Sequence, residues 1–383
     1  MSRPRQVSHV QDPPLACAAA AAALLLTGVG AAQADPPVGV QAAPTDNVSI
    51  SSVATQNFGD RLSVLYNATA PTGPKYYNWD SIGPIGQYDT IPVKRDPNCT
   101  YSRPFGSTAA IAQLETPRRT ASGAYCVDLA LSTRDVTADD GRGLAALQFG
   151  RDLVTWAAPS DGNAVANLTD AELRAIFSCD ATRLPAGDFQ HTGAVAWRDL
   201  TLEHGTSPDL VVPVLPWIAG SETRTRWLAG LGISAMGACG IDGLFNDQQI
   251  EEDQGSQPVF TAGTSAQYKD LIFPYSASHY ICQTVSGCAA TPPLTARQID
   301  GVAPITATHT LNTATFPGSY INILYVVFRN AGSTTTPLVP PNLVPLLGQG
   351  RATGFICGTV ATSAFTGSGL ATVPNCGAIR TTT

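Results

Sequence analysis

A change of residue pattern between positions 211 and 231 constrains the fold more than any other feature. The apolar run Val211–Leu215 stops at Pro216, residues 220–223 read Gly-Ser-Glu-Thr, and a helix-like pattern continues to Leu231. A strand that turns into a helix in this way directs unpaired backbone N–H groups and the positive end of the helix dipole toward one point, which suits an anion. The alternative is that Ser221 or Thr223 only caps the helix.

Three more turns of this design occur, at residues 51–55, 106–108 and 132–134. Strand and helix patterns alternate, which favours an α/β fold with mostly parallel sheets and a ligand site beyond the carboxyl ends of the strands. Converging turns would present amides, hydroxyls and two arginines to a small oxyanion or polyol. The candidate ligand-binding residues are Ser52, Thr55, Ser107, Thr108, Ser132, Thr133, Arg134, Ser221, Glu222, Thr223 and Arg224.

Local signals elsewhere in the chain place the main elements. Residues 167–177 predict a helix that Thr169 caps, with Glu172 completing a capping box. Apolar runs at 47–53, 153–158 and 320–329 predict strands, helical spacing predicts a helix at 56–66, and residues 271–283 predict a strand followed by a helix.

The first 34 residues have the pattern of an export signal. Arg3 and Arg5 precede an apolar run from Ala16 to Val29, and residues 32–34 read Ala-Gln-Ala, a small-residue cleavage site. We therefore expect a mature chain that begins near Asp35, lies outside the cytoplasm and has no transmembrane segment.

Length and charge limit the classes of partner. A chain of 383 residues is longer than one hydrophobic core usually holds, so two lobes are expected. Hydrophobic residues make up 44% and charged residues 13%, which indicates a globular protein. The net charge of −7 and the lack of a basic cluster argue against nucleic acid and anionic membranes as partners.

Eight cysteines remain beyond the expected signal, an even number that predicts disulfides in an exported chain. Sequence leaves nested and sequential pairing open, and we expect the sequential pairs Cys99–Cys126, Cys179–Cys239, Cys282–Cys288 and Cys357–Cys376. No Cys-x-x-Cys and no histidine at ligand spacing from a cysteine occurs, so neither a metal site nor a cofactor is expected.

Several segments in this order carry a family resemblance: residues 48–55, 103–108, 127–134, 152–157, 167–173, 215–224, 251–255 and 273–276. The chain resembles the phosphate-binding family of periplasmic solute-binding proteins, and particularly secreted actinobacterial substrate-binding-domain proteins. The resemblance implies a two-lobed, type 2 periplasmic-binding-protein-like fold that closes about a hinge. Residues 35–155 and 265–383 would form the first lobe, and residues 156–264 the second.

The resemblance also implies a monomer that captures a small anionic ligand, phosphate or another oxyanion, for an ABC permease. Ligand contacts would fall on the four turns. Glu222 stands where the family has glycine, Thr133 where it has aspartate, and Trp217 where it has the arginine that pairs with phosphate. Arg134 or Arg224 would then supply the cation, and Trp217 beside a hydroxyl-rich turn would also suit a sugar.

Two other functions stay open. A secreted hydrolase would need a nucleophile beside a base, but the chain has no Gly-x-Ser-x-Gly motif, and we interpret each mature histidine (His191, His204, His279, His309) as a surface or hydrogen-bonded residue. Asp139-Asp140 and residues 251–253 are interpreted as solvated acids. A non-transport surface protein would fit the Pro/Thr-rich end and four disulfides.

Overall fold

The structure is a computed structural model. It describes residues 35–37, 39–69, 72–82, 89–141, 143–184, 193–200, 208–216, 221–245, 248–249, 269–288, 293–349 and 354–381. The expected signal, Trp217, Gly220, the acids at 251–253, His191 and His204 lie outside these residues.

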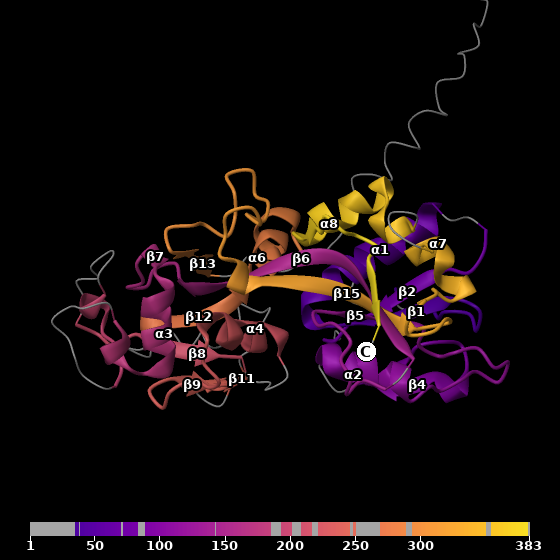
Figure 1. Cartoon of the computed structure of the whole chain (residues 1–383), viewed down its shortest axis with the longest axis horizontal. Coiled ribbons are helices and arrows are strands. Elements are labelled where there is room, and N and C mark those ends of the chain that lie inside the picture. The colour runs from indigo at the N-terminus through magenta and orange to yellow at the C-terminus, as the bar shows by residue number, and fades with distance from the viewer. Residues whose placement is uncertain are drawn as a thin grey trace, which may run out of the picture.

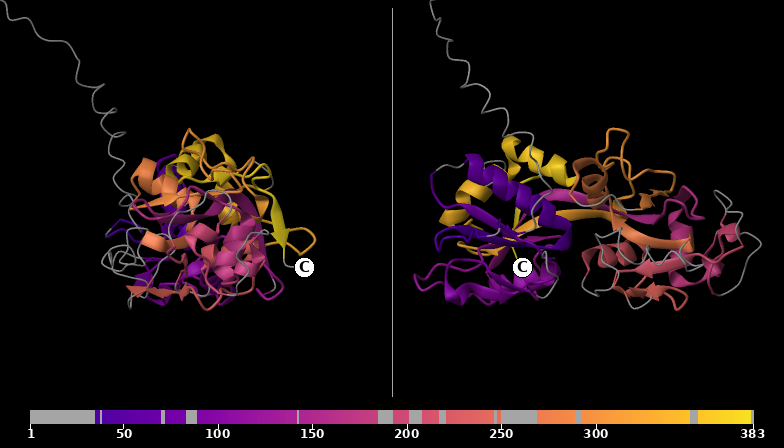
Figure 2. Two further views of the ribbon diagram at one scale, coloured as in Figure 1. Left: turned by 90° about the vertical axis from the view of Figure 1, so that its left-hand side faces the viewer. Right: turned by 180° about the vertical axis from the view of Figure 1, so that it is seen from behind.

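One mixed sheet runs through two lobes, with the strand order β2-β1-β5-β15-β6-β12-β8-β9. These strands are β2 (Tyr76–Trp79), β1 (Asn47–Ser51), β5 (Leu129–Ser132), β15 (Ile321–Arg329), β6 (Leu144–Pro159), β12 (Leu271–Ser276), β8 (Val212–Leu215) and β9 (Ile241–Asp242). The long strands β6 and β15 connect the lobes, and the view from behind shows the same separation (Figures 1 and 2). We call the lobe that holds β1 the first lobe and the lobe that holds β8 the second lobe.

The first lobe packs helices on both faces of β2-β1-β5-β15-β6. Helices α1 (Gln56–Thr69), α7 (Val344–Leu347) and α8 (Thr362–Ser368) belong to one core, and α2 (Gly106–Glu115) belongs to the other. Strand β15 serves both cores through its period of two: Leu324 and Val326 enter the first, whereas Tyr325 and Val327 enter the second. The strand is therefore apolar throughout its centre.

The second lobe is built on the remainder of β6 together with β12, β8 and β9. Helices α3 (Asp170–Ser178) and α4 (Glu222–Leu231) cover a core that includes the buried side chains of Trp156, Trp197 and Trp227. The predicted capping box of α3 is confirmed, because the Thr169 hydroxyl accepts from the Glu172 amide at 3.1 Å while the Glu172 carboxylate accepts from the Thr169 amide at 2.8 Å.

Short elements complete the fold. They are β3 (Thr90–Pro92), β4 (Thr100–Ser102), β7 (Asn167–Leu168), β10 (Leu244–Phe245), β11 (Gln248–Gln249), α6 (Ala277–Ile281), β13 (Leu294–Ala296), β14 (Gln298–Ile299), β16 (Ala371–Thr372) and β17 (Ile379–Thr381). The four disulfides join the sequential cysteine pairs that the sequence predicts, with Cα atoms 5.2 to 5.7 Å apart. Across the described ranges no helix is long and apolar enough to cross a membrane.

Two expectations about the architecture are wrong. The sheet is not mostly parallel, because β15 runs antiparallel to both β5 and β6, and β6 runs antiparallel to β12. The chain also does not return to the first lobe at residue 265: β12, α6 and the segment up to Tyr320 share a core with Trp156. The packing instead assigns residues 153–320 to the second lobe, and the return falls at β15.

Candidate functional site

Three of the four turns converge in the first lobe. Strands β1 and β5 are parallel neighbours, so the turns that follow them leave the same edge of the sheet. The Ser52 amide donates to the Leu131 carbonyl at 2.9 Å, and the Ser52 and Thr55 hydroxyls lie 3.0 Å apart. The hydrogen bond from Ser52 to Leu131 therefore holds the first turn beside the strand end that leads into the third.

The start of α2 joins this group through Ser107. Its hydroxyl accepts from the Thr133 amide at 2.9 Å and lies 3.2 Å from the Thr133 hydroxyl, with both residues buried. At the exposed rim, the Arg134 guanidinium donates to the Thr108 hydroxyl at 3.3 Å. Ser132 turns back toward its own chain, because its hydroxyl donates to the Arg134 carbonyl at 2.7 Å.

The fourth turn reaches this group from the second lobe through Glu222. The residue before α2, Phe105, has no side chain that could cap the helix, so its first amides bond to groups elsewhere in the chain. The Gly106 amide donates to the Ser81 hydroxyl at 3.3 Å. The Ser107 amide donates to Glu222 Oε1 at 2.5 Å, although Glu222 is the first residue of α4. The carboxylate of one lobe therefore caps a helix of the other.

The rest of the Glu222 carboxylate is sealed from solvent. Oε2 is buried and has no hydrogen-bond partner within the described part of the chain, and the residue as a whole is 9% exposed. Burial raises the pKa of Glu222, while the hydrogen bonds from Ser107 and the charge of Arg134 oppose the rise. Glu222 therefore keeps its proton to a higher pH than an ordinary glutamate does.

On α4 itself the capping interpretation is right for Ser221. Its hydroxyl accepts from the Arg224 amide at 3.2 Å, which is the bond of an N-cap residue. Thr223 follows one residue into the helix and is 3% exposed. Ser221 and Thr223 at the start of α4 therefore remain the predicted ligand contacts of the second lobe.

The two candidate arginines each have a carboxylate partner. Arg134 forms a two-pronged ion pair with Asp140 at 2.6 and 2.7 Å, and Arg224 is paired in the same way with Asp242. The interpretation of Asp140 as a solvated acid is therefore wrong, and Asp140 is 6% exposed. Arg134 and Arg224 are positioned near the turns with their charges largely balanced.

A polar cluster at the start of α6, which the sequence did not predict, marks the crossing between the lobes. Asp152 on β6 accepts from the Ser276 hydroxyl at 2.6 Å and from the Ser278 amide at 3.0 Å. The imidazole of His279 is buried, and it forms a hydrogen bond with the backbone of Val53. Burial lowers the pKa of His279 to about 4, so the ring is neutral near pH 7.

His279 is therefore buried and hydrogen-bonded, which is one of the two interpretations that its sequence context indicated. His309 does fit the surface interpretation, because it is exposed. A serine hydrolase needs a histidine nitrogen bonded to the nucleophile. His279 makes no such bond in the described ranges.

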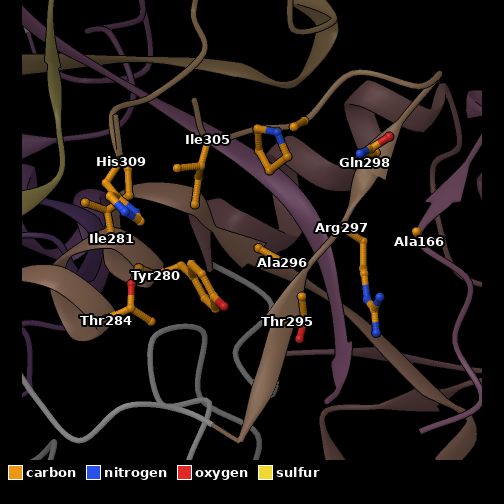
Figure 3. A pocket seen from close by; sticks show the side chains of 12 residues that line it. Ala166, Tyr280, Ile281, Thr284, Thr295, Ala296, Arg297, Gln298, Ile305 and His309 are labelled. Carbon is orange, nitrogen blue, oxygen red and sulfur yellow. The ribbon is translucent and has the colours of Figure 1, made fainter. Parts of the chain in front are cut away.

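A cavity of about 300 Å³ lies in the second lobe (Figure 3). Tyr280 and Thr284 line one side of it, and Arg297 and Thr295 line another. It contains none of the predicted ligand-binding residues. Among the residues that the structure places, no group of three or more histidine, cysteine or acidic side chains could hold a metal ion.

Comparison with solved structures finds proteins of similar fold. A phosphate ABC transporter substrate-binding protein from Clostridium perfringens, solved with bound phosphate, is 12% identical, with a TM-score of 0.50, and the match covers 86% of this chain and 100% of that one. A phosphate transport receptor from Vibrio cholerae is 14% identical, with a TM-score of 0.47 and coverage of 85% and 99%. PstS from Borrelia burgdorferi is 13% identical, with a TM-score of 0.42 and coverage of 85% and 98%.

The chain thus has the two-lobed α/β fold of periplasmic substrate-binding proteins. Of these neighbours, the Clostridium perfringens protein was solved with bound phosphate and the Vibrio cholerae protein is a phosphate transport receptor. No protein-family profile and no curated protein sequence matches the chain.

Proposed function

We propose that the protein is an exported solute-binding protein that captures a small oxyanion, phosphate or one of similar shape, between its lobes. The Ser107 amide and the hydroxyls of Ser52, Ser107 and Thr133 would hold the ligand from the first lobe. The amides and hydroxyls of Ser221 and Thr223 would hold it from the second. Capture would need no covalent step. Transfer of the ligand to an ABC permease belongs to the same proposal, and so does action as a monomer.

One observation carries the proposal: the N-terminus of α2 already holds a buried carboxyl group, that of Glu222. Helix N-termini stabilise anions through free amides and the helix dipole. An oxyanion at this point would use the same donors and would contact both lobes at once. The bound phosphate of the Clostridium perfringens protein supports this ligand class by likeness of fold.

Export has its own support in the structure. Four disulfides in one chain are typical of proteins that fold in an oxidising compartment. The proposal adds the signal at residues 1–34, which would be removed before the chain binds its ligand.

A binding panel tests the ligand class. Mature protein, stripped of ligand by unfolding and refolding with its disulfides intact, is heated with phosphate, sulfate or a sugar. We expect an oxyanion to raise the melting temperature, because a ligand at 100 times its Kd adds about 2.7 kcal/mol to the stability. Ser221→Ala combined with Thr223→Ala should reduce that ligand's affinity at least tenfold, since the second lobe loses two hydroxyl donors.

The matched control is Thr182→Ala, which removes an exposed hydroxyl of the same lobe far from the turns. It should leave the affinity unchanged. An affinity in the Ser221/Thr223 variant equal to that of the wild type would contradict the site assignment. A response to sugars alone would contradict the ligand class.

A further inference from the structure

We propose that the Glu222 carboxylate is a tethered competitor of the ligand: it occupies the Ser107 amide in the ligand-free protein, bridges the lobes, and must leave before an oxyanion enters. The inference rests on the proposed function, because it concerns the same site. It makes Glu222 the residue that sets the affinity of the site for anions.

The contact is specific and crosses between the lobes. Ser107 belongs to α2 and Glu222 to α4, 115 positions apart, and both side chains are buried. The acceptor Oε1 sits 2.5 Å from the Ser107 nitrogen, and Oε2 is buried beside it without a described partner. A carboxylate therefore fills the place that an oxyanion would take at the start of α2.

Electrostatics make the two occupants mutually exclusive. The nearby cations, Arg134 and Arg224, already form ion pairs with Asp140 and Asp242. A phosphate dianion beside Glu222 would thus bring further negative charge to a buried point that holds no unpaired cation among the described residues. Like charges in a partly buried site repel by several kcal/mol at contact distance, so the ligand and the carboxylate cannot share the amide.

The exchange has a mechanical consequence. Glu222 is fixed at the first position of a ten-residue helix, and its own cap Ser221 holds that helix end in place. The carboxylate therefore leaves the Ser107 amide by rotation of its own side chain, which keeps Ser221 and Thr223 at the site. Ligand-free protein would be bridged by Glu222, and loss of the side chain would leave the lobes free to separate.

The first test is the affinity for inorganic phosphate, measured by isothermal titration of refolded protein. Glu222→Ala should bind at least tenfold more tightly than the wild type, because the competitor is gone. Glu222→Gln keeps an acceptor without the charge and should fall between the two. The control Glu115→Gln neutralises a carboxylate at the exposed end of the same helix α2 and should bind as the wild type does.

Equal or weaker binding by Glu222→Ala, in a wild type that does bind phosphate, would overturn the inference and leave the proposed function standing. Absence of phosphate and sulfate binding in every variant would overturn the proposed function instead. The bridge is tested without any ligand by small-angle X-ray scattering. The radius of gyration of ligand-free Glu222→Ala and Glu222→Gln should exceed that of the wild type and of Glu115→Gln, and identical radii would overturn the bridge.

Discussion

Replacing Lys94 with methionine should lower the free energy of unfolding by about 3–5 kcal/mol. The Lys94 ammonium lies 2.8 Å from Asp128 Oδ2, and the two side chains are 1% and 6% exposed. It also donates to the Tyr125 carbonyl at 2.6 Å, while the Val48 amide donates to Asp128 at 2.9 Å. Methionine fills much of the same volume but leaves the Asp128 charge buried without its cation. Urea unfolding followed by circular dichroism measures the loss.

The matched control is the double variant Lys94→Met with Asp128→Asn. Asparagine keeps an acceptor for the Val48 amide and removes the unpaired charge, so the double variant should regain more than half of the lost stability. Equal losses in the single and double variants would mean that packing of the lysine stem, rather than the ion pair, stabilises this part of the first lobe.

Stability should fall as the pH rises from about 6.5 to 8, because of a second buried acid, Asp60 on α1. Below about pH 6.5 the lowered pKa of the buried His279 has the opposite effect on stability. Burial, together with the charge of Asp35, raises the pKa of Asp60 to about 8. The folded protein therefore keeps a proton that the unfolded chain, with an ordinary aspartate pKa near 4, has already released. Proton release then favours unfolding, by up to about 1.4 kcal/mol for each pH unit in this window.

Asp60→Asn should remove most of that slope and be more stable than the wild type at pH 8. Its neighbour Asn78 now donates to both Asp60 at 2.9 Å and Asp80 at 3.0 Å, so one amide serves two acids. Unfolding free energies between about pH 6.5 and 8 measure the slope. The exposed Asp139→Asn serves as control and should keep the wild-type slope. If the unfolding free energy of Asp60→Asn falls with pH as steeply as that of the wild type, a residue other than Asp60 holds the retained proton.

Local elements could be predicted from the sequence because their signals are local. The capping box of Thr169 and Glu172 defines the start of α3, and the apolar run 320–329 gives β15 almost residue for residue. Strand β6 was predicted only over its second half. Its first half, from Leu144, contains Gln148, Gly150 and Arg151, which interrupt the apolar pattern, yet the antiparallel pairing with β15 keeps the backbone extended.

The boundary between the lobes could not be predicted, since it depends on which core a segment joins. Residues near 271 read as a strand followed by a helix in either lobe, and only the pairing of β12 with β8 and β6 assigns them to the second. Pairing between strands that are far apart in the sequence produces no local residue pattern from which it could be predicted.

The turns of the candidate site could be predicted from the sequence, but the hydrogen bonds that join them could not. Hydroxyl residues at strand ends pointed to Ser52, Ser107 and Thr133, which do lie together in the first lobe. The sequence also showed that Glu222 stands at an unusual position. It could not show that Glu222 caps a helix of the other lobe, because that bond joins residues 115 positions apart.

One oxyanion is expected to bind each chain between the two lobes. This expectation is tested most directly by isothermal titration of inorganic phosphate into refolded wild-type protein at low ionic strength, with sulfate titrated in parallel. We predict saturable binding of one oxyanion per chain, with a lower Kd in Glu222→Ala than in the wild type. Titrations that show no saturable heat for either anion, in both the wild type and Glu222→Ala, would contradict it.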